Sequence, residues 1–334
     1  MDPISQAVFG CTASASIAKK DTIKPALLCG IVGGTIADLD ILIRSHEDSL
    51  LAIEFHRHFS HSIFFIPVGA LIVATLCFFL LRKKVHFKSL AIFSVASFAT
   101  HGFLDACTSY GTLLLWPVYN KRIAFDNISI IDPFFTFPLI ILILAVVIKR
   151  DIKFARYAFI YAFLYLSLGF VQKLRVESYI TNIANSQGHK IEKLKLNPTL
   201  GNIILWRSVY KSGDKYYINA VRMPIFGKVK IYPGSPIQYI EKDKLIKSLP
   251  SESLLRKDIN RFVNFSQGFI YFYPYMKNVI GDLRYGTLPN NDESLWGIKI
   301  NPNHPNRHAQ YLMLRNLDDI KINKFKSMLK GESF

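Results

Sequence analysis

The sequence contains few cysteines and few charged residues, and both shortages restrict what the protein can be. Its 334 residues include four cysteines, too few for a small scaffold held by disulfide bonds. All four lie before residue 108, so we expect the C-terminal half to fold without disulfides. Charged residues make up 19% and hydrophobic residues 50% of the chain, and this apolar content excludes an intrinsically disordered protein.

Acidic residues are scarcer than basic ones, and the imbalance is uneven along the chain. The formal net charge is +17, although the mean hydropathy is positive at +0.22. Residues 1–171 carry 15 basic and 11 acidic residues, whereas residues 172–334 carry 26 and 13. We therefore predict a mainly α-helical protein with a multi-pass transmembrane helical domain over 1–171, followed by a small, basic, water-facing α+β domain over 172–334.

The N-terminal domain contains five apolar segments. The clearest covers residues 62–81, about 20 residues without a charge, which matches a hydrocarbon core of about 30 Å. The others cover 25–43, 89–108, 134–148 and 157–171, and Gly30, Gly33 and Gly34 allow close helix packing in the first of them. We expect residues 4–18 to form a helix at the membrane interface. The acidic start lacks the basic region of a signal peptide, so no cleaved leader is expected.

Basic residues cluster in every second connection between these segments. The clusters are Lys19, Lys20 and Lys24; Arg82, Lys83, Lys84 and Lys88; and Lys149, Arg150, Lys153 and Arg156. By the positive-inside rule these connections face the cytoplasm, although Lys173 and Arg175 follow the last segment on the other side. The C-terminal domain is therefore predicted to lie outside the cytoplasm.

Ionisable residues gather near the outward ends of the apolar segments. They are Asp2, Asp38, Asp40, His56, Arg57, His58, His61, His101, Asp105, Asp126 and Asp132. His101 and Asp105 share a helix face because they are four residues apart, so they can bind one ion together. At ~1.5 Å per residue, His101 lies roughly 20 Å from Lys88, inside the apolar layer, where ionisable groups are costly and usually functional.

Two interpretations of this cluster remain open. Imidazoles and carboxylates together suit Zn²⁺ or a similar divalent ion, and Arg57 would suit an anionic substrate such as a phosphate. Alternatively, a non-catalytic membrane protein uses the same residues to hold helices together or to recruit a partner.

Several motifs resemble those of a bacterial inner-membrane family of metal-dependent hydrolases, some described as LexA-binding. They are MDPIS at 1–5, ADLD at 37–40, HRHFSHS at 56–62 and the long stretch HGFLDACTSYGTLLLWPVYNKRIAFDNISIIDP at 101–133. LWR at 205–207 and DLRYG at 282–286 resemble the C-terminal signatures of that family. The resemblance covers nearly the whole chain and implies location in the inner (cytoplasmic) membrane of a bacterium.

This family is distantly similar to zinc-dependent phospholipases C and fungal single-strand nucleases, helical enzymes that cleave phosphoesters. Their main metal site uses an Asp, a His and a His-x-x-x-Asp helix in that order. The resemblance therefore implies that a divalent metal ion, expected to be zinc, is bound by Asp40, His61, His101 and Asp105. Gln6 stands where the family usually has a histidine, and a second His-x-x-x-Asp motif is missing, so one or two ions are expected rather than three.

The same resemblance suggests roles for the remaining polar residues. Asp38 or His56 would support a ligand or act as a general base, and Arg57 would clamp an anion. The expected reaction is hydrolysis of a phosphoester or a lipid-linked small molecule by a metal-activated water.

The C-terminal half has a mixed pattern. We predict a hairpin over 202–210 and 216–223, a helix over 242–264 interrupted by Pro250, strands over 269–275 and 296–300, and a helix over 316–330. Its net charge of +13 favours membrane lipid headgroups as partners. The basic residues match no nucleic-acid-binding motif, and no protein partner is indicated. His304 and His308 flank Pro305 and are not expected to form a second metal site.

Overall fold

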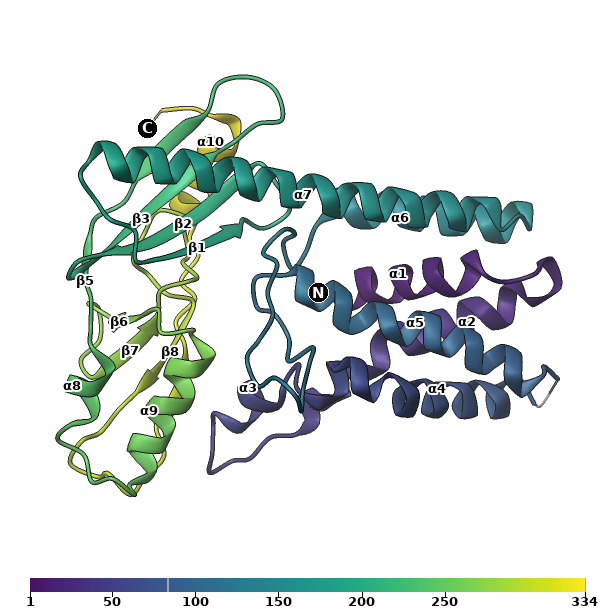
Figure 1. Cartoon of the computed structure of the whole chain (residues 1–334), viewed down its shortest axis with the longest axis horizontal. Helices are drawn as coiled ribbons and strands as arrows, with labels where there is room; N and C mark the ends of the chain where they lie inside the picture. Colours follow the sequence, from purple (N-terminus) through teal and green to yellow (C-terminus); the bar gives the residue numbers. More distant parts are fainter. Residues whose placement is uncertain (83, 334) are drawn as a thin grey trace. The chain divides into compact units, whose positions relative to one another are not determined.

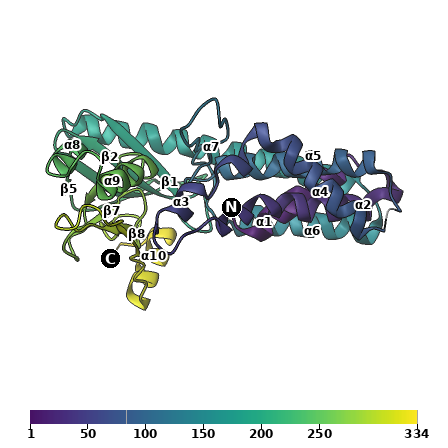
Figure 2. The ribbon, with the colours of Figure 1, turned by 90° about the horizontal axis from the view of Figure 1, so that it is seen from below.

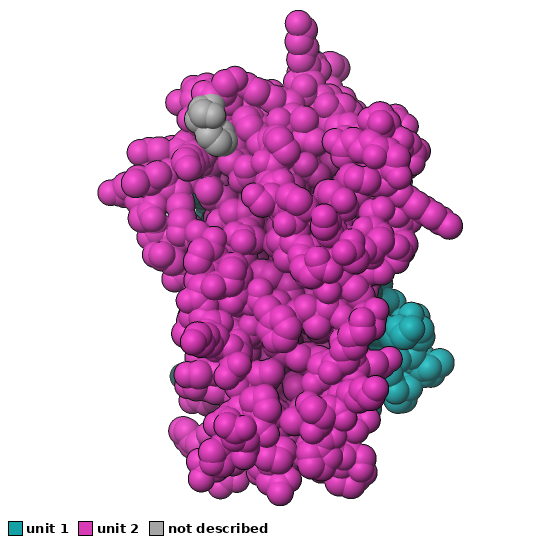
Figure 3. All heavy atoms as spheres, turned by 90° about the vertical axis from the view of Figure 1, so that its left-hand side faces the viewer, with its two compact units in different colours: residues 1–42, 55–171, 200–203 teal, residues 43–54, 172–199, 204–334 magenta. Residues whose placement is uncertain are grey.

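The computed structural model describes residues 1–82 and 84–333 and divides into two compact units (Figure 3). The helical unit comprises residues 1–42, 55–171 and 200–203. The sheet unit comprises residues 43–54, 172–199 and those from 204 onwards.

In the helical unit, apolar helices lie side by side (Figures 1 and 2). They are α1 (Pro3–Ser16), α2 (Ile23–Thr35), α4 (Ile66–Leu80), α5 (Phe87–Cys107), α6 (Pro133–Lys149) and the first part of α7 (Lys153–Ser186), while the short α3 (Leu51–Phe55) lies between α2 and α4 in the chain. Across residues 1–82 and 84–333, four stretches are long and apolar enough to cross a membrane: Lys20–Leu42, Ile63–Leu80, Phe87–Cys107 and Lys153–Ser186. The shorter apolar α6 is the fifth predicted segment.

Helix α1 packs inside the bundle, so its predicted position at the membrane interface is wrong. Phe9, Gly10 and most of its C-terminal half are buried, against α2, α5 and α6. A Cβ atom added to Gly10 would lie 3.0 Å from the Cα of Gly34. The predicted packing role of the glycines in α2 is confirmed, because their missing side chains let the two backbones meet.

The sheet unit contains two antiparallel sheets. The first has the order β1 (Lys193–Pro198), β2 (Leu205–Ser212), β3 (Lys215–Arg222) and β4 (Lys230–Pro233), with β5 (Ile237–Gln238) also paired to β3. The second has the order β6 (Ile270–Phe272), β7 (Val279–Asp282), β8 (Trp296–Lys299) and β9 (Gln310–Met313). Helices α8 (Lys242–Ile246), α9 (Leu254–Phe265) and α10 (Asp319–Lys330) complete the unit. Apolar helices followed by small antiparallel sheets confirm the predicted fold class.

The C-terminal half of α7 covers the first sheet (Figure 1). Val176, Ile180 and Ala184 recur every four residues, so they share one face of the helix, and this face packs on Trp206 and Val221. The polar face of the same helix segment remains accessible. The C-terminal half of α7 therefore forms one side of the hydrophobic core of this sheet.

The motifs at 205–207 and 282–286 come together inside this unit. The guanidinium of Arg207, which is buried, donates hydrogen bonds to the carbonyl oxygens of Leu283, Leu288 and Asn291. Arg284 forms a buried ion pair with Asp282 at 2.7 Å. These contacts satisfy charges that would be costly to bury alone, and they join the two sheets.

Candidate metal centre

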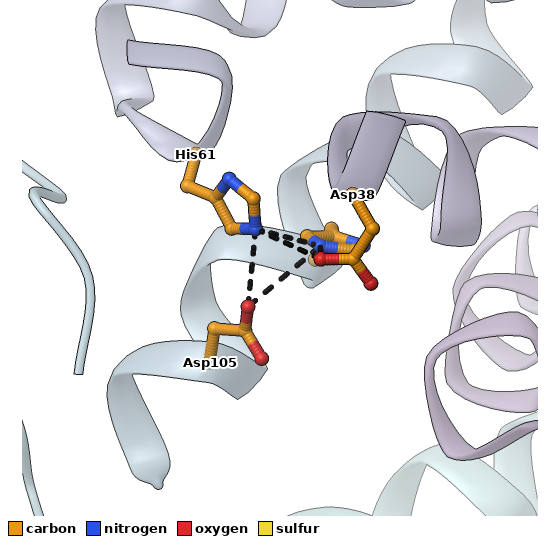
Figure 4. Close-up of side chains that lie close together, drawn as sticks. Asp38, His61 and Asp105 are labelled. Atoms are coloured by element: carbon orange, nitrogen blue, oxygen red, sulfur yellow. Dashed lines mark hydrogen bonds and ion pairs between the residues drawn. The ribbon is translucent and has the colours of Figure 1, made fainter. Parts of the chain in front are cut away.

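Four ionisable side chains converge in the helical unit. Asp38 comes from the short helix Ile36–Leu42, His61 from the short helix Phe59–His61, and His101 and Asp105 from α5. One ligand atom from each lies within 4.8 Å of the others. The Nε2 atom of His61 is 3.1 Å from Asp105 Oδ2 and 3.4 Å from Asp38 Oδ1, and these side chains point toward one another (Figure 4). The predicted His-x-x-x-Asp pair therefore belongs to a larger group.

Hydrogen bonds at the Nδ1 atoms fix the orientation of both histidine rings. His101 Nδ1 is 2.7 Å from the carbonyl oxygen of Gly34, which can only accept, so this nitrogen carries the hydrogen. His61 Nδ1 is 3.1 Å from Asp40 Oδ2 and 2.9 Å from Ser60 Oγ. In their neutral forms the two rings then present lone pairs at their Nε2 atoms, which are 2.9 Å apart. Two facing lone pairs beside two carboxylates need a cation or a proton between them.

Asp40 lies on the Nδ1 side of His61, opposite the Nε2 atom that faces the other three ligands. Its Oδ2 accepts hydrogen bonds from the Arg57 backbone N–H and from Ser60 Oγ, and its Oδ1 is 2.9 Å from His56 Nδ1. Asp38, Asp40 and His56 form an adjoining group of potential ligands, which shares Asp38 with the first. The family resemblance implies that Asp40 is the ligand and Asp38 its near neighbour. In the structure, Asp38 lies with His61, His101 and Asp105, and Asp40 contacts His61 on its far side.

The side chain of Arg57 is turned into the protein. Its backbone has a positive φ of 62°, and its guanidinium lies 3.1 Å from Asp105 Oδ2 and donates to Thr108 Oγ1 at 2.8 Å. The same group lies over the ring of Tyr110. The other carboxyl oxygen of Asp105 accepts from Gln6 Nε2 at 2.9 Å and contacts the α-amino group of Met1. Asp105 is thus surrounded by positive and donor groups.

Burial differs sharply across the cluster. The side chains of His61, His101 and Asp105 are 0% exposed, whereas those of Asp38 and His56 are 27% and 24% exposed. Burial lowers the pKa of His61, but hydrogen bonds with Asp105, Asp38 and Asp40 outweigh burial and raise its pKa to about 10. Without a cation, His61 therefore holds a proton at neutral pH. Access from outside the protein is on the side of Asp38 and His56.

Three further residues contribute to the site and were not predicted from the sequence. Ser60 bridges Asp40 and His61, and it lies within the HRHFSH motif that pointed to the site. The carbonyl group of Gly34 orients His101, but a backbone acceptor leaves no signal in the sequence. Gly102 follows His101 on α5, and a side chain there would clash with the carbonyl oxygen of His61.

Asp2 and Asp132, also noted in the sequence, are helix caps in the structure. Asp2 accepts hydrogen bonds from the backbone N–H groups of Ile4 and Ser5, and Asp132 accepts from those of Phe134 and Phe135. Proline follows each cap as the first helical residue, where it is most readily accommodated. These carboxylates start α1 and α6.

A further group of potential ligands lies in the sheet unit, where Asp48, Asp258 and His308 meet. The guanidinium of Arg261 lies 2.8 Å from Asp48 and 2.9 Å from Asp258. His308 Nδ1 is 2.9 Å from the other oxygen of Asp258. The ion pairs of Arg261 with Asp48, Glu54 and Asp258 hold residues 43–54 to the unit.

Comparison with known proteins places the chain among membrane proteins. It is 22% identical over 246 residues to the uncharacterized protein YfhP of Bacillus subtilis (strain 168), covering 71% of this chain and 73% of that protein. No solved structure matches the chain. The sequence profile described as YdjM inner membrane protein matches residues 1–176, more than half of the chain and all four converging ligands. The protein therefore belongs to the YdjM inner membrane protein family.

Proposed function

We propose that the protein is a membrane-embedded, metal-dependent hydrolase that acts on a phosphoester or a lipid-linked substrate. The observation that carries this proposal is the convergence of two imidazole Nε2 atoms and two carboxylates in a buried position. Ionisable groups in an apolar layer are costly and are usually retained for function. A structural pair would need one partner for each histidine, whereas here both Nε2 atoms face the same point.

We assign the ligand positions to Asp38, His61, His101 and Asp105. Two histidines and two carboxylates suit zinc, whose ligands in proteins are nitrogen, sulfur and carboxylate oxygen. Asp40 supports His61 from behind, as carboxylates commonly do for metal-bound histidines. In this assignment Asp38 and Asp40 exchange the roles that the family resemblance implied.

A divalent ion held here would polarise the scissile bond and acidify a water so that it can attack near neutral pH. His56 is the chain's own proton carrier in this proposal. Its Nδ1–H donates to Asp40 Oδ1, so its Nε2 can take a proton from the water and return it to the leaving group. The partial exposure of His56 and Asp38 supports an approach of the substrate from this side of the site.

Arg57 has a positioning role in the proposal. Its guanidinium is directed to Asp105 and Thr108, so it balances the charge of a buried carboxylate and fixes its orientation. A clamp on the substrate anion would need donors on the exposed side of the cluster, whereas Arg57 is 5% exposed. We therefore favour the positioning role of Arg57 over the anion-binding role predicted from the sequence.

The non-catalytic alternative has one observation in its favour. Gln6, in place of the family's usual histidine, donates to Asp105 and helps satisfy it without an ion. In that case the cluster would join α1, α5 and the connection at residues 56–61 by hydrogen bonds alone. Metal content and hydrolysis distinguish the two functions.

The test is metal content and activity of the protein purified in detergent. Wild type should hold zinc or a similar ion and hydrolyse a chromogenic phosphodiester, and His61→Ala and His101→Ala should lose both properties. His58→Ala is the matched control, because His58 belongs to the same motif but packs against Phe55 and Trp116. Metal at the wild-type ratio in both ligand variants would contradict the site, and bound metal without hydrolysis of any phosphoester would favour the alternative.

A further inference from the structure

An exposed apolar loop connects β3 to β4 in the sheet unit. Its base is buried at Met223 and Pro224, whereas Ile225 and Phe226 are 42% and 91% exposed. Among residues 1–82 and 84–333, Phe226 is the most exposed of the large hydrophobic side chains. It does not lie on a membrane-spanning helix, so lipid around the helices does not explain it.

The base of this loop is bonded to α7. Gln172 Nε2 donates to the carbonyl oxygen of Met223 at 2.8 Å, and Arg175 Nη1 donates to that of Pro224 at 3.1 Å. Arg175 also donates to Gln172 Oε1 at 2.5 Å. The two side chains are one helical turn apart, so the loop is held at a defined position along α7.

That position is where the apolar surface of α7 ends. Exposed apolar side chains follow the helix from Tyr157 to Leu174, with Lys173 near the end of the stretch, and basic Arg156 and Arg175 lie just beyond its two ends. At ~1.5 Å per residue this stretch is about 26 Å long. A hydrocarbon core is about 30 Å thick, so Leu174 lies close to its boundary. The β3–β4 loop is therefore attached at the depth of that boundary.

The opposite end of β3 lies farther along α7. The turn after β2 donates from Gly213 N–H to Glu192, which follows the end of α7 at Ser186. With ~3.3 Å per strand residue, Lys215 lies roughly 23 Å from Arg222. The β3–β4 loop is thus the end of this strand nearest the boundary, and the β2–β3 turn is the far end.

We propose that the β3–β4 loop inserts Ile225 and Phe226 into the bilayer at the boundary between headgroups and hydrocarbon. Lys228, which is exposed beside them, and Lys173 on α7 lie where the phosphates of anionic lipids would be. Apolar side chains flanked by lysines are the usual composition of a segment that binds the membrane surface. The bilayer is the partner, and the loop sets the depth of the first sheet. This inference does not depend on the proposed hydrolase activity.

The test measures how close the loop is to lipid. Phe226→Cys and Lys215→Cys of the full chain each receive a polarity-sensitive fluorophore by maleimide coupling, since the four native cysteines are buried. Each protein is reconstituted into vesicles of phosphatidylcholine and phosphatidylglycerol, with or without lipid carrying a spin label near the headgroup. Lipid quenching does not depend on the direction in which the protein inserts.

The probe at 226 should emit at shorter wavelength and be quenched about threefold more than the probe at 215, given an insertion depth of ~5–10 Å. Lys228→Glu should reduce quenching at 226 in vesicles containing phosphatidylglycerol. Equal, weak quenching at both positions would overturn the proposal. Shielding of the probe at 226 in lipid-free amphipol that increases with protein concentration would also overturn it, because a second copy would then cover the loop.

Discussion

At the scale of single residues, the protonation of His61 predicts how the stability of the metal-free protein depends on pH. Its pKa is raised from about 6.5 to about 10 by the surrounding carboxylates. A group whose pKa is raised on folding contributes stability that is complete below its unfolded pKa and lost as pH rises through its folded pKa. The chelated protein should therefore show a falling thermal midpoint between pH 7 and pH 10.

This prediction is measured by thermal unfolding in detergent across that range. Protein loaded with zinc should keep its midpoint over the same interval, because the ion replaces the proton on His61. His61→Gln removes the titrating group and is the control. If the thermal midpoint of the chelated wild type equals that of His61→Gln at every pH, His61 is already uncharged at pH 7 and the prediction is wrong.

The two aspartates of the ADLD motif provide a second prediction at this scale. Asp40→Asn should weaken zinc binding about 10–100-fold, as loss of a residue that supports a ligand usually does. Asp38→Asn should cost more, because it removes an oxygen that faces both Nε2 atoms. Zinc titration of the chelated variants measures both effects. The reverse order of affinities would return the ligand role to Asp40.

Sequence patterns could identify the residues of this cluster but not their arrangement. The apolar surroundings of His101 and Asp105 were informative because a charge inside a membrane segment is costly. Asp38 and Asp40 are separated by one residue, and their roles depend on the local turn of the short helix Ile36–Leu42. Arg57 has the residue type of an anion clamp, but its positive φ turns the side chain toward Asp105, and residue type carries no such information.

At the scale of elements, close contact between α5 and the His61 segment gives a further prediction. Gly102→Ala would press a methyl group against the carbonyl oxygen of His61, and this crowding should destabilise the site by about 1–3 kcal/mol. Zinc affinity should fall by about tenfold or more, since 1.4 kcal/mol corresponds to tenfold. Val95→Ala, at an exposed position of the same helix, is the control. Unchanged zinc affinity in Gly102→Ala would mean that the His61 segment can move freely.

Elements with strong local signals were predicted, and short ones were not. The hairpin of β2 and β3 and the break between α8 and α9 at Pro250 are confirmed, because turn residues and proline act locally. Strands β1, β4, β5, β7 and β9 were missed. Each has at most six residues, and so short a stretch shows too little periodicity to be distinguished from a loop. The burial of α1 was missed for a similar reason, since a helix of small residues has no marked apolar face.

At the scale of the whole molecule, the basic connections predict the direction of insertion. Three clusters at alternate connections should hold those loops in the cytoplasm, so a reporter fused after Lys190 should lie outside it. Paired fusions of alkaline phosphatase and a fluorescent protein at this point measure the location. A fluorescent fusion without phosphatase activity would reverse the orientation, and with it the side from which substrate reaches Asp38 and His56.

The composition of the two halves was sufficient to predict the fold class, because apolar helices and a basic, mixed region differ in average properties. Composition does not predict which segments of the chain belong to each unit. Residues 43–54 belong with the sheet unit through the ion pairs of Asp48 and Glu54 with Arg261, more than 200 positions away in the chain. Such pairing across long separations cannot be recognised in one sequence.

The origin of the ligands has a consequence for biogenesis. Asp38 lies near the end of the first spanning stretch, His61 precedes the second, and His101 and Asp105 belong to the third. The set of potential ligands is therefore incomplete until three stretches have been inserted in order. An ion bound by all of these ligands would link the three stretches. It would oppose the separation of any one helix from the bundle into lipid. Acquisition of the ion would thus be the last step of maturation, and its supply in the receiving compartment would limit how much stable protein accumulates.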